Sequence, residues 1–223
     1  MANWELSGVP VMLGRVTRPR AGNWVAELQV DAASAAGLSA GDAATLVTDG
    51  GALTFRGTVL RGDAYAQNVT LRLVGGANGL ARPVTPRFYR GVQLGQPLRD
   101  ALAGAGEQLS GTAQAAATSL HLAYWTAVQQ PASEALTSLA EAAGPDVVWR
   151  VLPDGTVFFG EDGFPESALE EFDLTMSRPL EKMQEIASEA PTVHPGETFN
   201  GFRVSTVVHQ VNPDASRVTL WYE

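Results

Sequence analysis

"VVWRVLPDGTVFFGED", residues 147–162, is the most strongly patterned stretch of the chain. Two runs of β-branched and aromatic residues flank Pro153-Asp154-Gly155. An Asp-Gly pair between two such runs is typical of a tight β-hairpin turn. The stretch therefore predicts a hairpin that has Trp149 in the core and helps to hold the middle of the chain together.

The residues before position 90 also have the pattern of β-strands. Apolar and polar residues alternate over residues 24–30, "TLVTDGGALTF" (45–55) predicts another hairpin, and "NVTLRLVGG" (68–76) again alternates. Turn-forming sequences recur about every ten residues. Several short strands at that spacing predict a small β-barrel or β-sandwich.

The pattern changes to mixed helix and strand over residues 91–163. One apolar stripe predicts a helix that has Pro97 at its first position; its members are Leu98, Leu102, Ala105 and Leu109. Residues 112–117 predict a loop and residues 119–131 a strand. A second helix is predicted in "ASEALTSLAEAAG" (132–144), with Ser133 as N-cap, Leu136 and Leu139 buried, and Gly144 at the end. Helix, strand, helix and hairpin together predict a compact α/β unit.

The C-terminal region returns to strands. "EDGFPESALEEFD" (161–173) predicts a solvated connection, because runs of acids are typical of wetted surfaces. "FRVSTVVHQV" (202–211) and "RVTLWYE" (217–223) predict two strands joined by a turn at Asn212-Pro213-Asp214.

Composition and charge exclude several classes of protein. The 223 residues contain no cysteine, which excludes disulfides and cysteine metal sites, and no run approaches the roughly 18 apolar residues of a membrane helix. The N-terminus does not have the pattern of a signal peptide, so we expect synthesis in a cytoplasm. Net charge is −9: residues 1–99 hold ten Arg against six acids (+4), and residues 100–223 hold five basic residues against eighteen acids (−13). Sequence-specific binding to nucleic acid is not expected of so acidic a chain. The unequal charge of the two halves favours either two unrelated surfaces or charge complementarity between neighbouring subunits.

No catalytic signature is present in the sequence. His121, His194 and His209 lack metal-ligand spacing, no G-x-S-x-G occurs, and "GGANGLA" lacks the Lys and Ser/Thr of a phosphate-binding loop. The acidic residues that could serve a glycoside hydrolase are Glu107 and the pair Glu161-Asp162. The tryptophans are expected to be core residues, with a sugar-binding platform as the alternative; they are Trp4, Trp24, Trp125, Trp149 and Trp221. We therefore predict no catalytic, metal-binding or cofactor-binding residues, and no cofactor.

The order of these pieces resembles a known family. "TLRLVGGANGLARPVTPRFYRGVQLGQPLRDALAGAGEQLSG" (70–111), "YWTAVQQPASEALTSLAEAAG" (124–144) and the hairpin at 147–162 follow one another as in baseplate hub proteins of contractile-tailed bacteriophages. That family includes late control protein D and the hubs of contractile injection systems. "VHPGETFNGFRVSTVVHQVNPDASRVTLW" (193–221) is similar to the stretch leading into the second barrel of such hubs.

The resemblance implies a mainly β fold with an α+β insertion, in which two small, tube-like β-barrels flank a compact α/β unit. The first barrel would be residues 1–90, the α/β unit 91–163 and the second, smaller barrel 164–223. It further implies a homotrimer whose six barrels form a ring, adapting a six-fold tail tube to a three-fold spike and leaving a channel for DNA. Closure of such a ring requires heterologous contacts that repeat, and unpaired barrel edges could supply them. The chain is short for a hub, so the spike is expected to be a separate chain.

The expected partners are further copies of the chain, the tail tube protein, a spike protein and baseplate wedge proteins, with the tape measure protein as an additional candidate. The expected location is the virion tail baseplate, after assembly in the host cytoplasm. Two other functions remain open: a tail-associated cell-wall (peptidoglycan) hydrolase and a glycan-binding β-module. Arginine is favoured at interfaces, so we expect subunit contacts at two groups of arginines, which are Arg15, Arg18 and Arg20 and then Arg82, Arg87 and Arg90.

Overall fold

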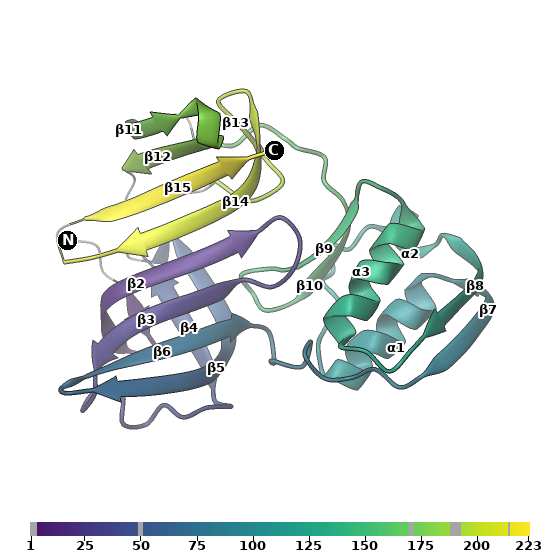
Figure 1. Cartoon of the computed structure of the whole chain (residues 1–223), viewed down its shortest axis with the longest axis horizontal. Helices are drawn as coiled ribbons and strands as arrows, with labels where there is room; N and C mark the ends of the chain where they lie inside the picture. Colours follow the sequence, from purple (N-terminus) through teal and green to yellow (C-terminus); the bar gives the residue numbers. More distant parts are fainter. Residues whose placement is uncertain (1–3, 49–50, 170–171, 188–192, 214) are drawn as a thin grey trace.

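The structure is a computed structural model that describes residues 4–48, 51–169, 172–187, 193–213 and 215–223. Figure 1 shows a β-barrel and a neighbouring C-terminal sheet on one side, and a mixed helix and strand unit on the other. Strands β9 and β10 lie between them (Figure 1). The mainly β fold with an α+β insertion, predicted from the sequence, is confirmed.

Six antiparallel strands form a closed barrel near the N-terminus. They are β1 (Glu5–Leu6), β2 (Val9–Pro19), β3 (Val25–Asp31), β4 (Ala43–Thr48), β5 (Leu53–Tyr65) and β6 (Asn68–Gly75). The order is β1-β4-β5-β6-β3-β2, and pairing between β1 and β2 closes the ring. Every predicted strand in this region is present; the turn residues Asp49 and Gly50 lie outside the described residues.

Two glycines make room for the largest side chain of the barrel. A Cβ at Gly57 would lie 2.8 Å from the Trp24 ring, and a Cβ at Gly75 would lie 2.5 Å from its Nε1. Trp24 is buried and meets Phe55 edge-on, with ring centroids 5.3 Å apart. The glycines thus let an indole ring fill space that side chains on β5 and β6 would otherwise occupy.

The C-terminal strands extend the barrel edge to edge. They are β11 (Asp173–Arg178), β12 (Met183–Ala187), β13 (Thr198–Phe199), β14 (Phe202–Val211) and β15 (Ser216–Tyr222), with a 3-10 turn at Pro179–Glu181. Residues 206–211 of β14 pair with residues 19–14 of β2, and the sheet continues through β15 and β12 to β11. This sheet has its own core, which includes Ile186, Phe199, Val207 and Leu220. The two strands predicted from residues 202–211 and 217–223 are confirmed.

The middle of the chain is the predicted α/β unit. It contains β7 (Arg87–Gln93), α1 (Gly95–Ala105), α2 (Ala115–Thr118), β8 (His121–Ala127), α3 (Ala132–Ala143), β9 (Val147–Val151) and β10 (Val157–Glu161). β7 pairs with β8, and β9 pairs with β10, both antiparallel. The buried side chains of the unit belong to the same hydrophobic cluster as those of the barrel. The unit is therefore packed against the barrel and not merely tethered to it.

Four local predictions in this unit are wrong. The apolar stripe predicted to be helical as far as Leu109 is helical only to Ala105, because α1 ends there and Gly106 adopts a left-handed backbone conformation. α3 begins at Ala132, so Ser133 lies inside its first turn; carbonyls of Arg82 and Leu80 accept from the N–H groups of Ala132 and Ser133, and no side-chain cap is needed. Pro97 lies two residues after the start of α1, where the absence of an N–H is still harmless. Residues 115–118 form a short helix in place of the end of the expected loop. The predicted end of the second helix is confirmed, because Gly144 follows α3 directly. The predicted buried face is also confirmed, because Leu136 and Leu139 of α3 are fully buried.

The predicted tryptophan core is largely confirmed. Trp4, Trp24, Trp125 and Trp149 are each at most 8% exposed. Trp221 is 37% exposed, because its position on β15 places it on the outward face between buried Leu220 and Tyr222. Within the described ranges, no helix is long and apolar enough to cross a membrane.

Candidate functional site

The β9–β10 hairpin attaches the α/β unit to the barrel. The N–H of Gly22 donates to the carbonyl of Trp149 (2.8 Å), and the N–H of Val151 donates back to Gly22 (3.0 Å). Nε1 of Trp24 donates to the Leu152 carbonyl (3.1 Å), and the N–H of Arg56 donates to Pro153 (2.7 Å). The hairpin thus contacts the barrel through the second half of its first strand and through its turn. Its role is to join two parts of the chain.

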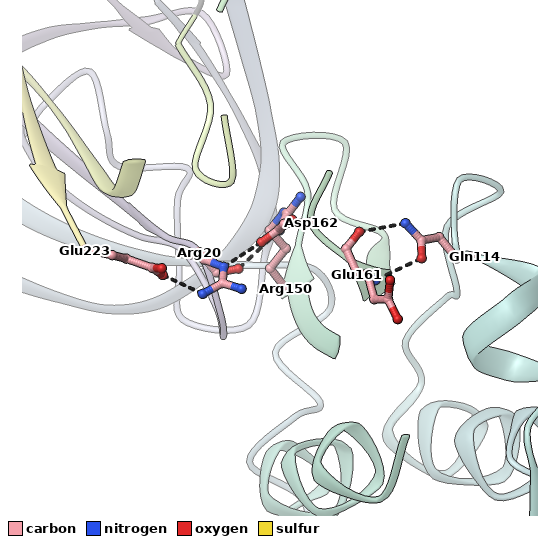
Figure 2. Close-up of polar contacts among 6 residues, drawn as sticks. All are labelled: Arg20, Gln114, Arg150, Glu161, Asp162 and Glu223. Carbon is pink, nitrogen blue, oxygen red and sulfur yellow. Dashed lines mark hydrogen bonds and ion pairs between the residues drawn. The ribbon is translucent and has the colours of Figure 1, made fainter. Parts of the chain in front are cut away.

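One buried carboxylate ties three segments together next to this hairpin. The side chain of Asp162 is 2% exposed and accepts from Nε of Arg20 (2.7 Å) and from Nη1 of Arg150 (2.5 Å). Arg20 also pairs with the side chain of Glu223, at the end of β15. Figure 2 shows this chain of charges, which runs from the C-terminal sheet across β2 to the hairpin. Two charge-assisted hydrogen bonds hold this buried carboxylate in place, and its removal would leave Arg150 without its carboxylate and Arg20 with Glu223 alone.

A side-chain amide secures the other side of the hairpin. Nε2 of Gln114 donates to the Glu161 carbonyl (2.6 Å), and Oε1 of Gln114 accepts from the Glu161 N–H (2.9 Å), as Figure 2 shows. The amide therefore imitates a neighbouring strand along β10. A Cβ at Gly160 would lie 2.7 Å from the Gln114 side chain, which explains the glycine.

Arg18 is buried in a cluster in which none of the described carboxylates contacts it. The side chain lies on the inward face of β2, and the residue is 5% exposed. Nη2 of Arg18 lies 2.6 Å from Nδ1 of His194, and Nη1 lies 3.4 Å from Nε2 of His209. The guanidinium can only donate, so both ring nitrogens accept and both imidazoles are neutral. The ring of Phe55, 5.7 Å away, covers the guanidinium carbon.

The electrostatics of this cluster follow from its burial. Burial lowers the pKa of Arg18 to about 10, opposed by Glu197 and reinforced by Arg150. Burial, followed by repulsion from Arg18 and Arg150, lowers the pKa of His194 to about 4. Burial, followed by the charge of Arg18 and then by His194, also lowers the pKa of His209 well below its usual value. The cluster at neutral pH is therefore one cation surrounded by neutral rings.

The glycine-rich segment after β6 forms a cradle for a carboxylate. Glu107 is 7% exposed and accepts from the N–H groups of Ala77 (3.0 Å) and Gly79 (2.8 Å). A Cβ at Gly76 would lie 2.4 Å from Oε2 of Glu107, and one at Gly79 would lie 1.7 Å from the Ala105 carbonyl oxygen. The "GGANG" sequence therefore serves the packing of the residues just after α1 against the end of the barrel.

Two of the three residues proposed for a hydrolase, Glu107 and Asp162, are engaged in these structural contacts. Glu107 is saturated by backbone donors, and Asp162 is saturated by two arginines. Glu161 is exposed at the end of β10. Within the described part of the chain, no group of three or more His, Asp or Glu side chains could hold a metal ion. Glu107 and Asp154 line one cavity, of about 540 Å³, and Glu107 is held there by the backbone N–H groups of Ala77 and Gly79.

The arginines predicted for subunit contacts fall into two classes. Arg18 and Arg20 are used within the chain, as described above. Arg15, Arg82 and Arg90 are exposed, and Arg87 pairs with Asp100 at the surface (2.7 Å). The structure thus does not bring the six residues into one surface.

An exposed aromatic face lies beside the second group of arginines. On the β7–β8 pair, Arg90 is the cross-strand partner of Tyr124, and Phe88 is the partner of Thr126. Phe88 is 62% exposed and Tyr124 74%. The opposite face buries Tyr89 against Trp125. Sequence reasoning did not identify this face, although the alternation of Phe88, Tyr89 and Arg90 carried the signal.

No protein-family model matches the sequence, and no curated protein matches it. Solved structures do match. A 43 kDa tail protein of prophage MuSo2 from Shewanella oneidensis superposes with a TM-score of 0.73 at 8% identity, covering 98% of this chain and 96% of that one. A tail protein from Neisseria meningitidis gives a TM-score of 0.68 at 11% identity, covering 98% and 95%.

A third similar structure comes from a secretion system. It is an E. coli component of the type VI secretion system, described as similar in structure to the T4 bacteriophage tail proteins gp27 and gp5. The TM-score is 0.70 at 11% identity, covering 97% of this chain and 75% of that one. The chain therefore has, over nearly its whole length, the fold found in these phage tail and type VI secretion proteins.

Proposed function

We propose that this protein is a structural, non-enzymatic component of a phage tail baseplate, in which it acts as the hub. Several copies, three in the simplest form, make a ring that adapts a six-fold tail tube to a three-fold spike. The ring leaves a channel for DNA during genome ejection. Its partners are the tube, a separate spike chain, wedge proteins and the tape measure protein, and its location is the virion tail.

One observation supports this proposal above the others. The fold match extends over 98% of this chain and 96% of a phage tail protein, so it includes the barrel, the α/β unit and the C-terminal sheet together. A shared fold alone does not specify function. The buried charges add to it, because two of the carboxylates considered for a hydrolase, Glu107 and Asp162, are engaged in joining segments of the chain.

We propose the domain limits 1–90, 91–163 and 164–223. The closed barrel β1–β6 lies in the first segment and the α/β unit with β9–β10 in the second. Strands β11–β15 lie in the third and have a separate core. In the ring, the first and third segments would take the two barrel positions of each subunit.

We propose that acidic residues of the second half of the chain line the channel. A lumen of this charge would let DNA pass without being retained, because phosphate binding requires basic surface. The electrostatic potential of an assembled ring tests this point, and a basic lumen would contradict it.

The decisive experiment is a measurement of mass and copy number. Purified protein is expected to give a discrete oligomer, with three copies as the expected number, and to be found at the baseplate in particles imaged by electron microscopy. A stable monomer that never enters a tail would overturn the proposal. Incubation with purified peptidoglycan tests the hydrolase alternative, and we expect no release of soluble fragments.

A further inference from the structure

A cavity of about 440 Å³ opens where β2, the turn of the β9–β10 hairpin and the segment around His194 meet. Arg18, Arg150 and His194 line its polar side. Pro19, Leu152 and Pro195 are among the residues that line the rest. Asp154, from the hairpin turn, also lines the cavity, which thus combines two guanidinium groups and one acidic residue with an apolar wall.

The charge of Arg18 is not balanced by a contacting acid. Within the described residues, its hydrogen-bond partners are the two neutral imidazoles and the carbonyl of Val193 (3.5 Å). A guanidinium that is buried without a carboxylate is unfavourable, and proteins usually pair such a charge. In the part of the chain that the structure describes, the cluster therefore lacks the anion that ordinarily accompanies a buried arginine.

The acids near the cavity are already engaged elsewhere. Asp162 is shared by Arg150 and Arg20. Glu197 accepts from the N–H of His194 (2.8 Å), and Asp154 accepts from the N–H and hydroxyl of Thr156. Among the described residues, no acid contacts Arg18, so an anion for it can be supplied by a partner.

We propose that this cavity binds a carboxylate carried on an aliphatic stem, supplied by the acidic side chain or chain terminus of a partner. Guanidinium groups match the planar geometry of a carboxylate. The ring hydrogen of His194 lies on Nε2, since Nδ1 accepts from Arg18, so this ring can donate as well. The apolar wall suits the methylene groups of a stem. A free phosphate has more acceptor oxygens than such a wall can satisfy.

The binding test uses the purified chain alone, so its outcome does not depend on whether the protein is part of a tail. The probe is N-acetylglutamate α-amide, which carries one carboxylate on two methylene groups, and its matched control is the neutral N-acetylglutamine α-amide. Binding is followed by NMR through the side-chain resonances of Arg150 and His194. We expect saturable shifts with a dissociation constant on the order of millimolar for the acidic probe. The neutral probe is expected to bind at least about tenfold more weakly.

Two variants make the assignment specific without removing a buried residue. Thr54 is exposed and lines the cavity. Thr54→Glu places a carboxylate at its mouth and is expected to weaken binding of the acidic probe about tenfold or more. Thr126→Glu makes the same change on β8, outside the cavity, and is expected to leave binding unchanged.

Inorganic phosphate is the third probe, and its binding is compared with that of the acidic probe. Phosphate that shifts the same resonances at lower concentration than the acidic probe would overturn the carboxylate assignment. Equal binding by the acidic and neutral probes, or no saturable shift with any probe, would overturn the site itself. Equal loss in the Thr54→Glu and Thr126→Glu variants would show an unspecific charge effect and would also count against it.

Discussion

Nη2 of Arg18 donates to Nδ1 of His194 across 2.6 Å, although the two residues are 176 positions apart in the sequence. The contact joins β2 of the barrel to the segment that precedes the C-terminal strands. His209, on β14, contacts the same guanidinium from the neighbouring strand. The arrangement is stable only while both rings are neutral, because a protonated ring nitrogen cannot accept from arginine.

The first prediction is a loss of stability in mild acid. Burial lowers the pKa of His194 from 6.5 to about 4 in the folded chain, and the pKa of His209 is also lowered. The unfolded chain therefore takes up protons first as the pH falls below about 6.5. Stability is complete above that pH and decreases between about pH 6.5 and pH 4, by roughly 1.4 kcal/mol per pH unit for each histidine. Urea unfolding at a series of pH values measures this slope.

Two variants assign the slope to the cluster. His194→Gln is expected to make it shallower, because one of the two titrating rings is removed. His121→Gln is the matched control, since His121 is exposed on β8, and it is expected to keep the original slope. A free energy of unfolding that does not change between pH 6.5 and pH 4.5 would contradict the prediction.

The second prediction concerns the carboxylate shared by Arg20 and Arg150. Asp162→Asn removes the negative charge but keeps the shape, so two partly buried cations lose their common partner. We expect the free energy of unfolding to fall by about 3 kcal/mol. Denaturant unfolding measures the change.

The adjacent residue provides the control for that experiment. Glu161 is exposed, and its contacts with Gln114 use only its backbone N–H and carbonyl. Glu161→Gln is therefore expected to change stability by less than about 0.5 kcal/mol. Equal effects of the two substitutions would show that the shared carboxylate has no special role.

The third prediction tests the carboxylate cradle. Glu107→Ala leaves the N–H groups of Ala77 and Gly79 without their acceptor in a buried position. Unsatisfied buried donors cost about 1–3 kcal/mol, and we expect a destabilisation in that range by thermal or denaturant unfolding. Glu141→Ala, on the exposed side of α3, is the control and is expected to be nearly neutral. A destabilisation of equal size in the control would remove the argument for the cradle.

Strands and helices could be predicted from the sequence because their signals are local. The alternation in β3 and β6, the stripe of α1 and the Asp-Gly turn of β9–β10 each lie within one short segment. Capping at Ser133 could not be predicted correctly. The acceptors that replace a cap there belong to residues 80–82, some fifty positions earlier in the sequence.

The buried polar contacts could not be predicted for a related reason. His194 and His209 lack a shared spacing, and only the pairing of β2 with β14 brings His209 to Arg18. One local signal did exist. Arg18 lies in phase with buried Val16 on β2, and His209 lies in phase with Val207 and Val211 on β14. A charged or polar residue in the apolar phase of a strand indicates a buried partner, although the sequence does not say which partner.

The fourth prediction tests the proposed subunit contact on the β7–β8 pair. Arg90 and Tyr124 are cross-strand partners on an exposed face, and Phe88 is exposed on the same face. Arginine and aromatic residues are enriched at interfaces, so this face is the part of the predicted arginine set best suited to a neighbouring subunit. Arg90→Glu reverses the charge on this face and is expected to raise the dissociation constant of the oligomer at least about tenfold. Monomer stability is expected to stay within about 0.5 kcal/mol, because the side chain is exposed.

Arg61→Glu reverses a charge on the barrel surface, away from this face, and is expected to leave the oligomer intact. Sedimentation analysis measures the oligomeric state of both variants. An unchanged oligomer in Arg90→Glu would show that the interface lies on another surface. Equal dissociation of both variants would show that the oligomer depends on net charge alone.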